Sequence, residues 1–193
     1  RPLGLVPLVP AFLVSVGARL LPRAAVPGGA PTLCDVQIVA TGVSRRLLPA
    51  ANDVLCTLSD PRVADLARKI GNTRTAASVE LWGNHLDGAV VAIGNSPTAL
   101  FHLLDLLRDS DIRPAVIIGI PVGFIGAAES TQALADNNLG LDYPVVHGTR
   151  GGSASTCGPL PAIASEPERA PLRTSSHLAV GGHHGSEREP TRP

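Results

Sequence analysis

The sequence has few of the features that attract a charged partner. It has no methionine, and one tryptophan, one tyrosine and three phenylalanines are too few for a surface on which bases could stack. Sixteen basic residues balance sixteen acidic ones, so no net charge favours a polyanion or an anionic membrane. The composition therefore predicts neither a nucleic-acid partner nor a membrane partner.

Cysteine is also scarce, and the three cysteines are spread along the chain. Cys34, Cys56 and Cys157 form no Cys-x-x-Cys pair of the kind that zinc sites and redox sites use. We expect Cys34 and Cys56 to be small buried residues in apolar runs, with a reactive thiol as the alternative. The pattern predicts no metal site and fits a reducing, cytoplasmic location.

Long uninterrupted apolar runs are missing as well. Residues 1–29 are apolar, but five prolines exclude a long helix there and leave the stretch too broken to span a membrane. A secretory signal is the alternative interpretation of this stretch. We predict an irregular segment over 1–29 and, from its Pro, Ser, Glu, Arg, Gly and His content, a disordered tail over 156–193. Because the chain starts at Arg1 and lacks methionine, it is expected to be a fragment or an aberrant reading of a gene.

Between residues 30 and 155, short apolar runs alternate with helical patterns, which is typical of an α/β fold with a parallel sheet. One helix is expected between Arg62 and Leu81, and another is expected to begin with Ser96 as its cap and Pro97 at its first position. The five predicted strands cover residues 32–34, 53–58, 89–93, 115–120 and 144–148.

Each of four predicted strands ends in a polar or glycine-rich turn. The carboxyl ends of parallel strands meet at one edge of a sheet, where backbone amides can reach a ligand. These amides, together with the guanidinium of Arg150, suit carboxylates, so an anionic ligand is predicted. The alternative is that the glycines only form tight turns. No Walker loop or Gly-x-Gly-x-x-Gly motif supports nucleotide binding.

Individual polar residues allow two interpretations. Glu129 could contact a ligand, or it could stabilise the start of a helix through the helix dipole. Asp35 could contact a ligand, or its side chain could accept hydrogen bonds from the backbone of its own turn. Of the histidines, only His147 lies near this predicted edge, and no Ser-His-Asp order or His-Glu-x-x-His motif can be assembled.

Six sequence blocks, in order, resemble the signature blocks of the precorrin-8X methylmutase family. The similarity covers residues 30–155. The blocks are Ala-Pro-Thr-Leu-Cys-Asp at 30–35, Val-Leu-Cys-Thr-Leu with Asp-Pro-Arg at 54–62, Ile-Gly-Asn-Thr-Arg-Thr-Ala-Ala at 70–77, Ala-Ile-Gly-Asn-Ser-Pro-Thr-Ala-Leu-Phe at 92–101, Ile-Gly-Ile-Pro-Val-Gly-Phe-Ile-Gly-Ala-Ala-Glu-Ser at 118–130, and Arg-Gly-Gly-Ser-Ala at 150–154.

The resemblance implies a three-layer, flavodoxin-like fold and a homodimer with sites near the subunit interface. It implies an isomerase of cobalamin biosynthesis that moves a methyl group from C-11 to C-12 of precorrin-8X to give hydrogenobyrinate, without a metal or organic cofactor. The corrinoid substrate is expected to contact seven residues: Asp35, Asn95, Thr98, Gly123, Glu129, Ser130 and Arg150.

The sequence departs from the family at both ends. Nothing in residues 1–29 resembles the family region with the proton-transfer histidine, and the first histidine is His85, so no catalytic residue is assigned. We therefore divide the chain into a divergent segment at 1–29, an incomplete methylmutase-like domain at 30–155 and a tail at 156–193. Two alternatives to the isomerase stay open: an inactive remnant that binds corrinoid, and an unrelated α/β module that binds a small anionic metabolite.

Overall fold

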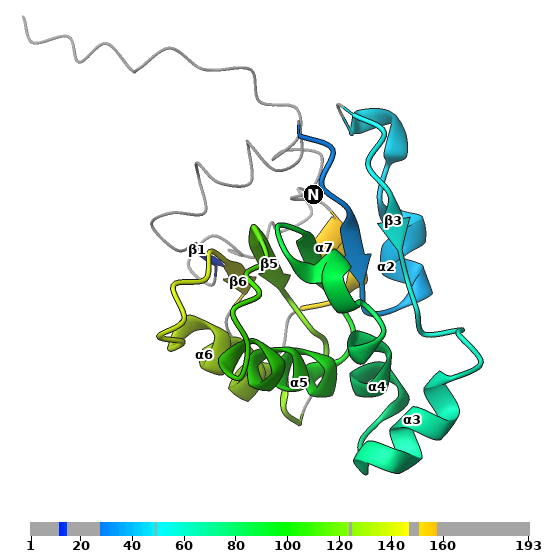
Figure 1. The fold of residues 1–193 in the computed structure, drawn as a ribbon. Coiled ribbons are helices and arrows are strands. Elements are labelled where there is room, and N and C mark those ends of the chain that lie inside the picture. Colours follow the sequence, from blue (N-terminus) through cyan, green and yellow to red (C-terminus); the bar gives the residue numbers. More distant parts are fainter. Residues whose placement is uncertain (1–11, 15–27, 49, 124, 147–150, 158–193) are drawn as a thin grey trace, which may run out of the picture.

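A computed structural model of the chain describes residues 12–14, 28–48, 50–123, 125–146 and 151–157 (Figure 1). Within them a six-stranded sheet has the order β1-β6-β5-β4-β2-β3. Its five neighbouring strands from β6 to β3 are parallel, and β1 pairs antiparallel with β6 at one edge. The strands are β1 (Phe12–Val14), β2 (Thr32–Cys34), β3 (Val54–Leu55), β4 (Val90–Ile93), β5 (Val116–Gly119) and β6 (Pro144–Val146).

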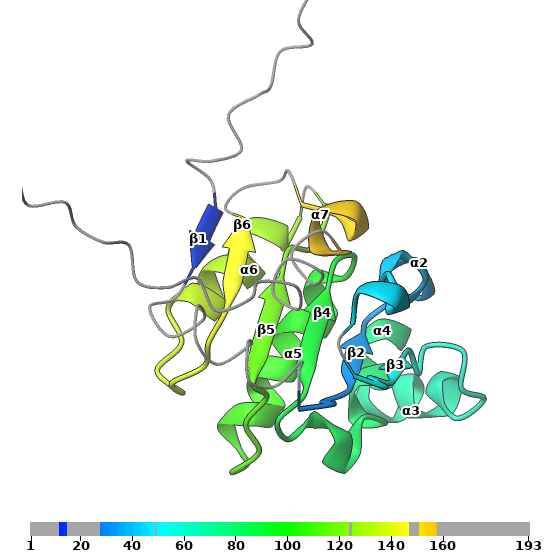
Figure 2. The same ribbon diagram turned by 90° about the horizontal axis from the view of Figure 1, so that it is seen from above.

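Helices cover both faces of the sheet, so the molecule has three layers (Figures 1 and 2). One face packs against α4, α5 and α6, and the other packs against α2 and α7. This arrangement confirms the predicted α/β fold with five parallel strands. The helices are α2 (Gln37–Gly42), η2 (Arg45–Leu47), α3 (Val63–Ile70), α4 (Arg74–Glu80), η3 (Gly83–Leu86), α5 (Pro97–Arg108), α6 (Ala127–Ala135) and α7 (Ser153–Cys157).

The central strands are apolar along their whole length because both of their faces are covered. Every residue of β4 and β5 is buried. Alternate side chains belong to different cores: Val91 packs with Leu100 and Leu103 of α5, whereas Ala92 packs with Val39 of α2. Burial on two sides explains why the strands appear in the sequence as continuous apolar runs rather than as alternating patterns.

The single helix expected between Arg62 and Leu81 is wrong, because two helices occupy this stretch. Gly71 ends α3 in the left-handed conformation, with a φ of 64°, which costs glycine little. Thr73 then caps α4 by accepting a hydrogen bond from the amide of Ala76 at 3.2 Å. The apolar spacing in the sequence continues across this break, so the spacing alone did not reveal it.

The sheet also has one strand more than expected, since β1 lies in the segment predicted to be irregular. Its register pairs Phe12 with Val146 and Val14 with Pro144. Prolines exclude a long helix from this segment, but a three-residue edge strand fits between them. The four longer predicted strands are each shorter in the structure, and residues 147 and 148 of the last one lie outside the described residues.

Both predictions for the start of α5 are confirmed. Ser96 accepts a hydrogen bond from the amide of Ala99 at 3.3 Å, and Pro97 is the first residue of the helix. The short helix α7 extends to Cys157, two residues past the expected domain boundary, and Thr156 in it is fully buried. The rest of the predicted tail lies outside the described residues. Among the helices of the described ranges, none has both the length and the apolar character that a membrane span requires.

Candidate functional site

Three loops meet at the carboxyl ends of the parallel strands, which we call the carboxyl edge. Asp35 follows β2, residues 94–96 follow β4, and residues 120–123 follow β5. The ladders pair Cys34 with Ala92 and Ile93 with Gly119, so these loops leave neighbouring strands at similar heights. The turns that follow the apolar runs predict this convergence, and ligands of open parallel sheets bind at such an edge.

Asp35 is fully buried between β2 and the loop after β4. One carboxylate oxygen accepts from the amide of Gly94 at 3.2 Å, and the other accepts from the amides of Asn95 at 2.9 Å and Ser96 at 2.8 Å. Burial raises the pKa of Asp35 above its ordinary range, while the hydrogen bonds from Ser96, Gly94 and Asn95 oppose that rise. The carboxylate therefore fastens the loop rather than facing solvent.

Four hydroxyl groups form a connected network where α4 and α5 begin, which we call the hydroxyl cluster. The Oγ1 atoms of Thr73 and Thr98 are 2.7 Å apart. The Oγ1 atom of Thr75 lies 2.7 Å from Oγ of Ser96, which in turn lies 2.9 Å from Oγ1 of Thr98. Arg74, which lies between Thr73 and Thr75 in the sequence, is exposed. The cluster joins hydroxyl groups from two helix starts that the sequence pattern does not connect.

The loop after β5 is shaped by close backbone contacts. A Cβ atom at Gly151 would overlap the carbonyl oxygen of Pro121 and lie 2.6 Å from that of Ile120, so only glycine fits there. The amide of Gly152 donates to the carbonyl of Ile120 at 2.8 Å. Farther along, a Cβ at Gly126 would lie 3.3 Å from that of Pro97, so α6 and α5 begin side by side.

The predicted substrate residues at this edge differ in how exposed they are to solvent. Asn95 is exposed, Thr98 and Gly123 are half-buried, and Glu129 is exposed in the first turn of α6. Asp35 is fully buried, as described. Ser130 is fully buried too, and its hydroxyl donates to the carbonyl of Ala127 at 3.0 Å. Arg150 and His147 lie outside the described residues. Ligand contact by these residues stays a prediction.

A cavity of about 650 Å³ lies beside α2 and β3, and sequence analysis did not predict it. Two arginines line it, and Arg45 donates to the carbonyl of Val54 at 3.3 Å. The run Ser44-Arg45-Arg46, which begins two residues after the end of α2, is the only hint of it in the sequence pattern. The lining residues are Gln37, Ala40, Thr41, Val43, Ser44, Arg45, Arg46, Val54, Leu55 and Cys56.

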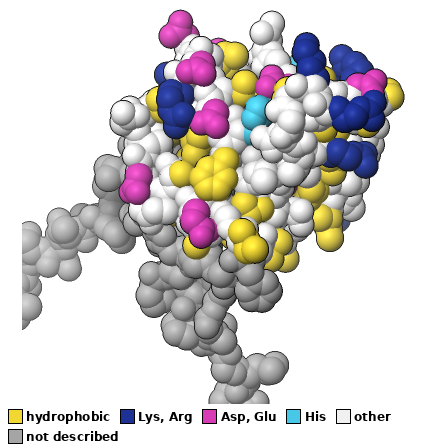
Figure 3. All heavy atoms as spheres, turned by 90° about the horizontal axis from the view of Figure 1, so that it is seen from below, with side chains coloured by type: hydrophobic (Ala, Val, Ile, Leu, Met, Phe, Trp, Pro, Cys, Tyr) yellow, Lys and Arg dark blue, Asp and Glu magenta, His cyan; other side chains and the backbone are white. Residues whose placement is uncertain are grey.

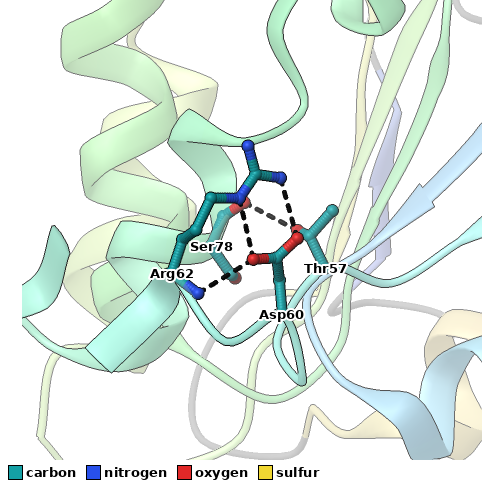
Figure 4. A network of polar contacts seen from close by, with 4 residues as sticks. All are labelled: Thr57, Asp60, Arg62 and Ser78. Carbon is teal, nitrogen blue, oxygen red and sulfur yellow. Dashed lines mark hydrogen bonds and ion pairs between the residues drawn. The ribbon is translucent and has the colours of Figure 1, made fainter. Parts of the chain in front are cut away.

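The loop leaving this cavity after β3 is held by polar contacts (Figure 4). Asp60 accepts from Nε of Arg62 at 2.9 Å and from Nη2 at 2.8 Å, and the pair lowers the pKa of Asp60 to about 2. The hydroxyl of Thr57 donates to the carbonyl of Ser78 at 2.7 Å, which ties the loop to α4. The loop after β3 is thus tied to α4, the helix whose first turn carries Thr75 of the hydroxyl cluster.

The three cysteines, distant in sequence, pack in one core cluster under the carboxyl edge. Cys34 is fully buried, and burial raises the pKa of its thiol far above the ordinary range. Cys56, which was expected to be buried, is only half-buried, as is Cys157, and this partial burial also raises the pKa values of both thiols. In the described part of the chain, no three His, Cys, Asp or Glu side chains are grouped so that they could hold a metal ion.

The surface over α3 to α6 carries its charges unevenly although the chain is neutral overall. Figure 3 shows most Lys and Arg side chains toward one side of this face and most Asp and Glu side chains over the rest, with some of each sign among the other. Exposed basic residues at and near α3 include Arg62, Arg68 and Lys69. Arg62 and Arg68 pair with Asp60 and Asp65, so part of this basic charge is also balanced locally.

Comparisons with known proteins agree with the fold and the sequence blocks. The family model described as precorrin-8X methylmutase matches residues 11–166. A precorrin-8X methylmutase of Sinorhizobium sp. is 57% identical over 142 residues, which cover 74% of this chain and 68% of that protein. The precorrin-8X methylmutase of Pseudomonas aeruginosa is 50% identical over 165 residues, covering 86% of this chain and 79% of the relative.

A solved structure from the same family is also similar, at lower sequence identity. The crystal structure of a precorrin-8X methylmutase from Thermus thermophilus superimposes with a TM-score of 0.71 at 32% identity, over 80% of this chain and 75% of that one. The family model covers more than half of the chain and extends on both sides beyond residues 30–155, the range of the six similar sequence blocks. The chain therefore belongs to the precorrin-8X methylmutase family.

Proposed function

We propose that this chain is an isomerase of cobalamin biosynthesis that acts on precorrin-8X and moves a methyl group from C-11 to C-12 of the corrinoid ring. The observation that carries the proposal is membership of the family, with 57% identity to a relative bearing the name of that activity. The reaction rearranges one molecule and needs no second substrate. The protein's task is then to hold a large acid in one orientation and to move protons.

The distribution of donors supports a substrate with several carboxylate arms. The hydroxyl cluster and the exposed side chain of Asn95 offer neutral hydrogen bonds at the carboxyl edge. Arg74 at the start of α4 and Arg45 and Arg46 in the cavity offer charge-assisted bonds, which are about twice as strong as neutral ones. We propose that the acetate and propionate arms of the substrate are divided between these two groups of donors.

Within the described residues, histidine contributes nothing to this edge. His85 belongs to η3, which precedes β4 and so lies toward the opposite ends of the strands. In α5, His102 lies with Nε2 2.8 Å from a carboxylate oxygen of Glu80. We therefore assign substrate binding to this edge and leave proton transfer without a described residue. The homodimer implied by the resemblance and the cytoplasmic location expected from the cysteine pattern stay predictions.

The proposal is tested by titrating the full chain with hydrogenobyrinate and then supplying precorrin-8X. We expect a saturable change in the pigment's absorption spectrum, followed by conversion of precorrin-8X at a rate above background. Replacing both Arg45 and Arg46 by glutamine is expected to weaken binding by about 10-fold or more, since even one lost charge-assisted bond is worth about 1.5–3 kcal/mol.

A matched control is Arg108→Gln, because Arg108 lies at the end of α5 and pairs with Asp105 at 2.7 Å on the surface. Its affinity for the pigment should equal that of the wild type. Binding without turnover would favour the remnant that binds corrinoid. Absence of any spectral change would leave only the module for a small anionic metabolite.

A further inference from the structure

The environment of Asp35 differs from that of a residue that contacts a ligand. Its side chain is fully buried, and its two oxygens already accept three hydrogen bonds from consecutive amides of the loop after β4. A substrate carboxylate would also be repelled by this charge. Asp35 therefore cannot meet a ligand directly, and the amides of Gly94, Asn95 and Ser96 are not free to do so either.

The loop that Asp35 holds carries the groups that do face outward. Asn95 is exposed at its centre. Ser96 caps α5 and places its hydroxyl 2.7 Å from that of Thr75 and 2.9 Å from that of Thr98. The loop and Asp35 come from neighbouring strands of the sheet. A rigid sheet thus sets the position of Asp35, and Asp35 sets the position of the loop.

We infer that Asp35 is a positioning residue, which orients Asn95 and the hydroxyl cluster toward a carboxylate-bearing ligand by binding three successive amides. The inference rests on the proposed function for the nature of that ligand. Asparagine could not replace it: the side-chain amide has one acceptor oxygen, and its NH₂ group would face a backbone donor. A fixed loop loses less freedom when a ligand binds, so its fixation raises affinity.

The test compares Asp35→Asn with wild-type protein by two measurements on the full chain. Hydrogen exchange at residues 94–96 reports whether the loop is held, and we expect at least 10-fold faster exchange in the variant. Spectral titration with hydrogenobyrinate, counted per folded molecule, reports the effect on the ligand, and we expect about 10-fold weaker binding. The control is Asp105→Asn, which removes an exposed carboxylate of α5 and should change neither.

The outcomes separate this inference from the proposed function. Faster exchange with unchanged affinity per folded molecule would reduce Asp35 to a purely structural residue and overturn the inference. Failure of wild-type protein to bind the pigment would remove the proposed function. Hydrogen exchange alone would then test whether Asp35 holds the loop.

A second variant covers the case in which Asp35→Asn does not fold. Asn95→Ala changes only an exposed side chain, and we expect about 5-fold weaker binding of hydrogenobyrinate from it. In wild-type protein, the amides of residues 94–96 should exchange more slowly than those of the partly exposed turn at 110–111. Equal exchange in the two segments, or unchanged binding by Asn95→Ala, would overturn the inference.

Discussion

The loops after β4 and β5 leave adjacent strands at the same edge, yet they are held in different ways. The loop after β4 is fixed by a buried carboxylate and a network of hydroxyls, so its contacts are polar and directional. The loop after β5 is fixed by glycine-sized backbone contacts, and it leaves Val122 42% exposed and Ile125 90% exposed.

The difference indicates that the two loops of the candidate site suit different parts of a ligand. Polar contacts fix the direction of donor groups, which suits the recognition of carboxylates. Close backbone packing fixes the path of the chain but leaves apolar side chains at the surface, where they can contact the hydrocarbon part of a large ligand. A tetrapyrrole acid has both kinds of surface, so one loop can serve its arms and the other its ring.

The largest effect is expected from Gly151→Ala, which attacks the packing of the loop after β5. The new Cβ would overlap a backbone oxygen of Pro121, which cannot move aside as a flexible side chain can. We expect a loss of about 3 kcal/mol in the free energy of unfolding, measured by urea denaturation.

The control for this change is Gly83→Ala, where a Cβ meets nothing within 4 Å and only the left-handed φ of 49° is unfavourable. It should cost about 1 kcal/mol. Equal losses at the two positions would mean that backbone contact does not hold the loop after β5.

A smaller effect is expected from Thr98→Val, which tests the polar contacts that hold the loop after β4. Valine keeps the shape but removes the hydroxyl bonded to those of Thr73 and Ser96. We expect a loss of about 1 kcal/mol in stability and roughly 5-fold weaker binding of hydrogenobyrinate.

Thr131→Val is the matched control, because its buried hydroxyl donates to the carbonyl of Ala127 within α6, at 3.1 Å. It should cost similar stability and leave pigment affinity unchanged. If both variants bind the pigment as the wild type does, the hydroxyl cluster is structural rather than a binding surface.

The smallest effect is expected from Ser130→Ala. The hydroxyl of Ser130 is buried and occupied by a bond within its own helix, and alanine is the better helix former. We expect a change of less than about 1 kcal/mol in stability and none in pigment affinity, measured by the same titration. A clear fall in affinity would instead support the direct contact that sequence analysis predicted for Ser130.

Much of the sheet was predictable from sequence, because strands buried on two sides are continuous apolar runs. The cap at Ser96 was predictable too, since its chemistry is local. The cavity with Arg45 and Arg46 was not, because it forms only when α2 packs beside β3. The burial of Asp35 was equally hidden, since its amide partners lie about sixty residues farther along the chain.

The break at Gly71 has a consequence for how the molecule opens. It turns α3 away from the sheet (Figure 1), and Val63 and Ala67 of α3 pack with Ala77 in a small core separate from the two that cover the sheet. Undocking this helix exposes little apolar surface compared with opening the central strands. We therefore expect α3 to undock locally at a lower free energy than the opening of the central strands requires.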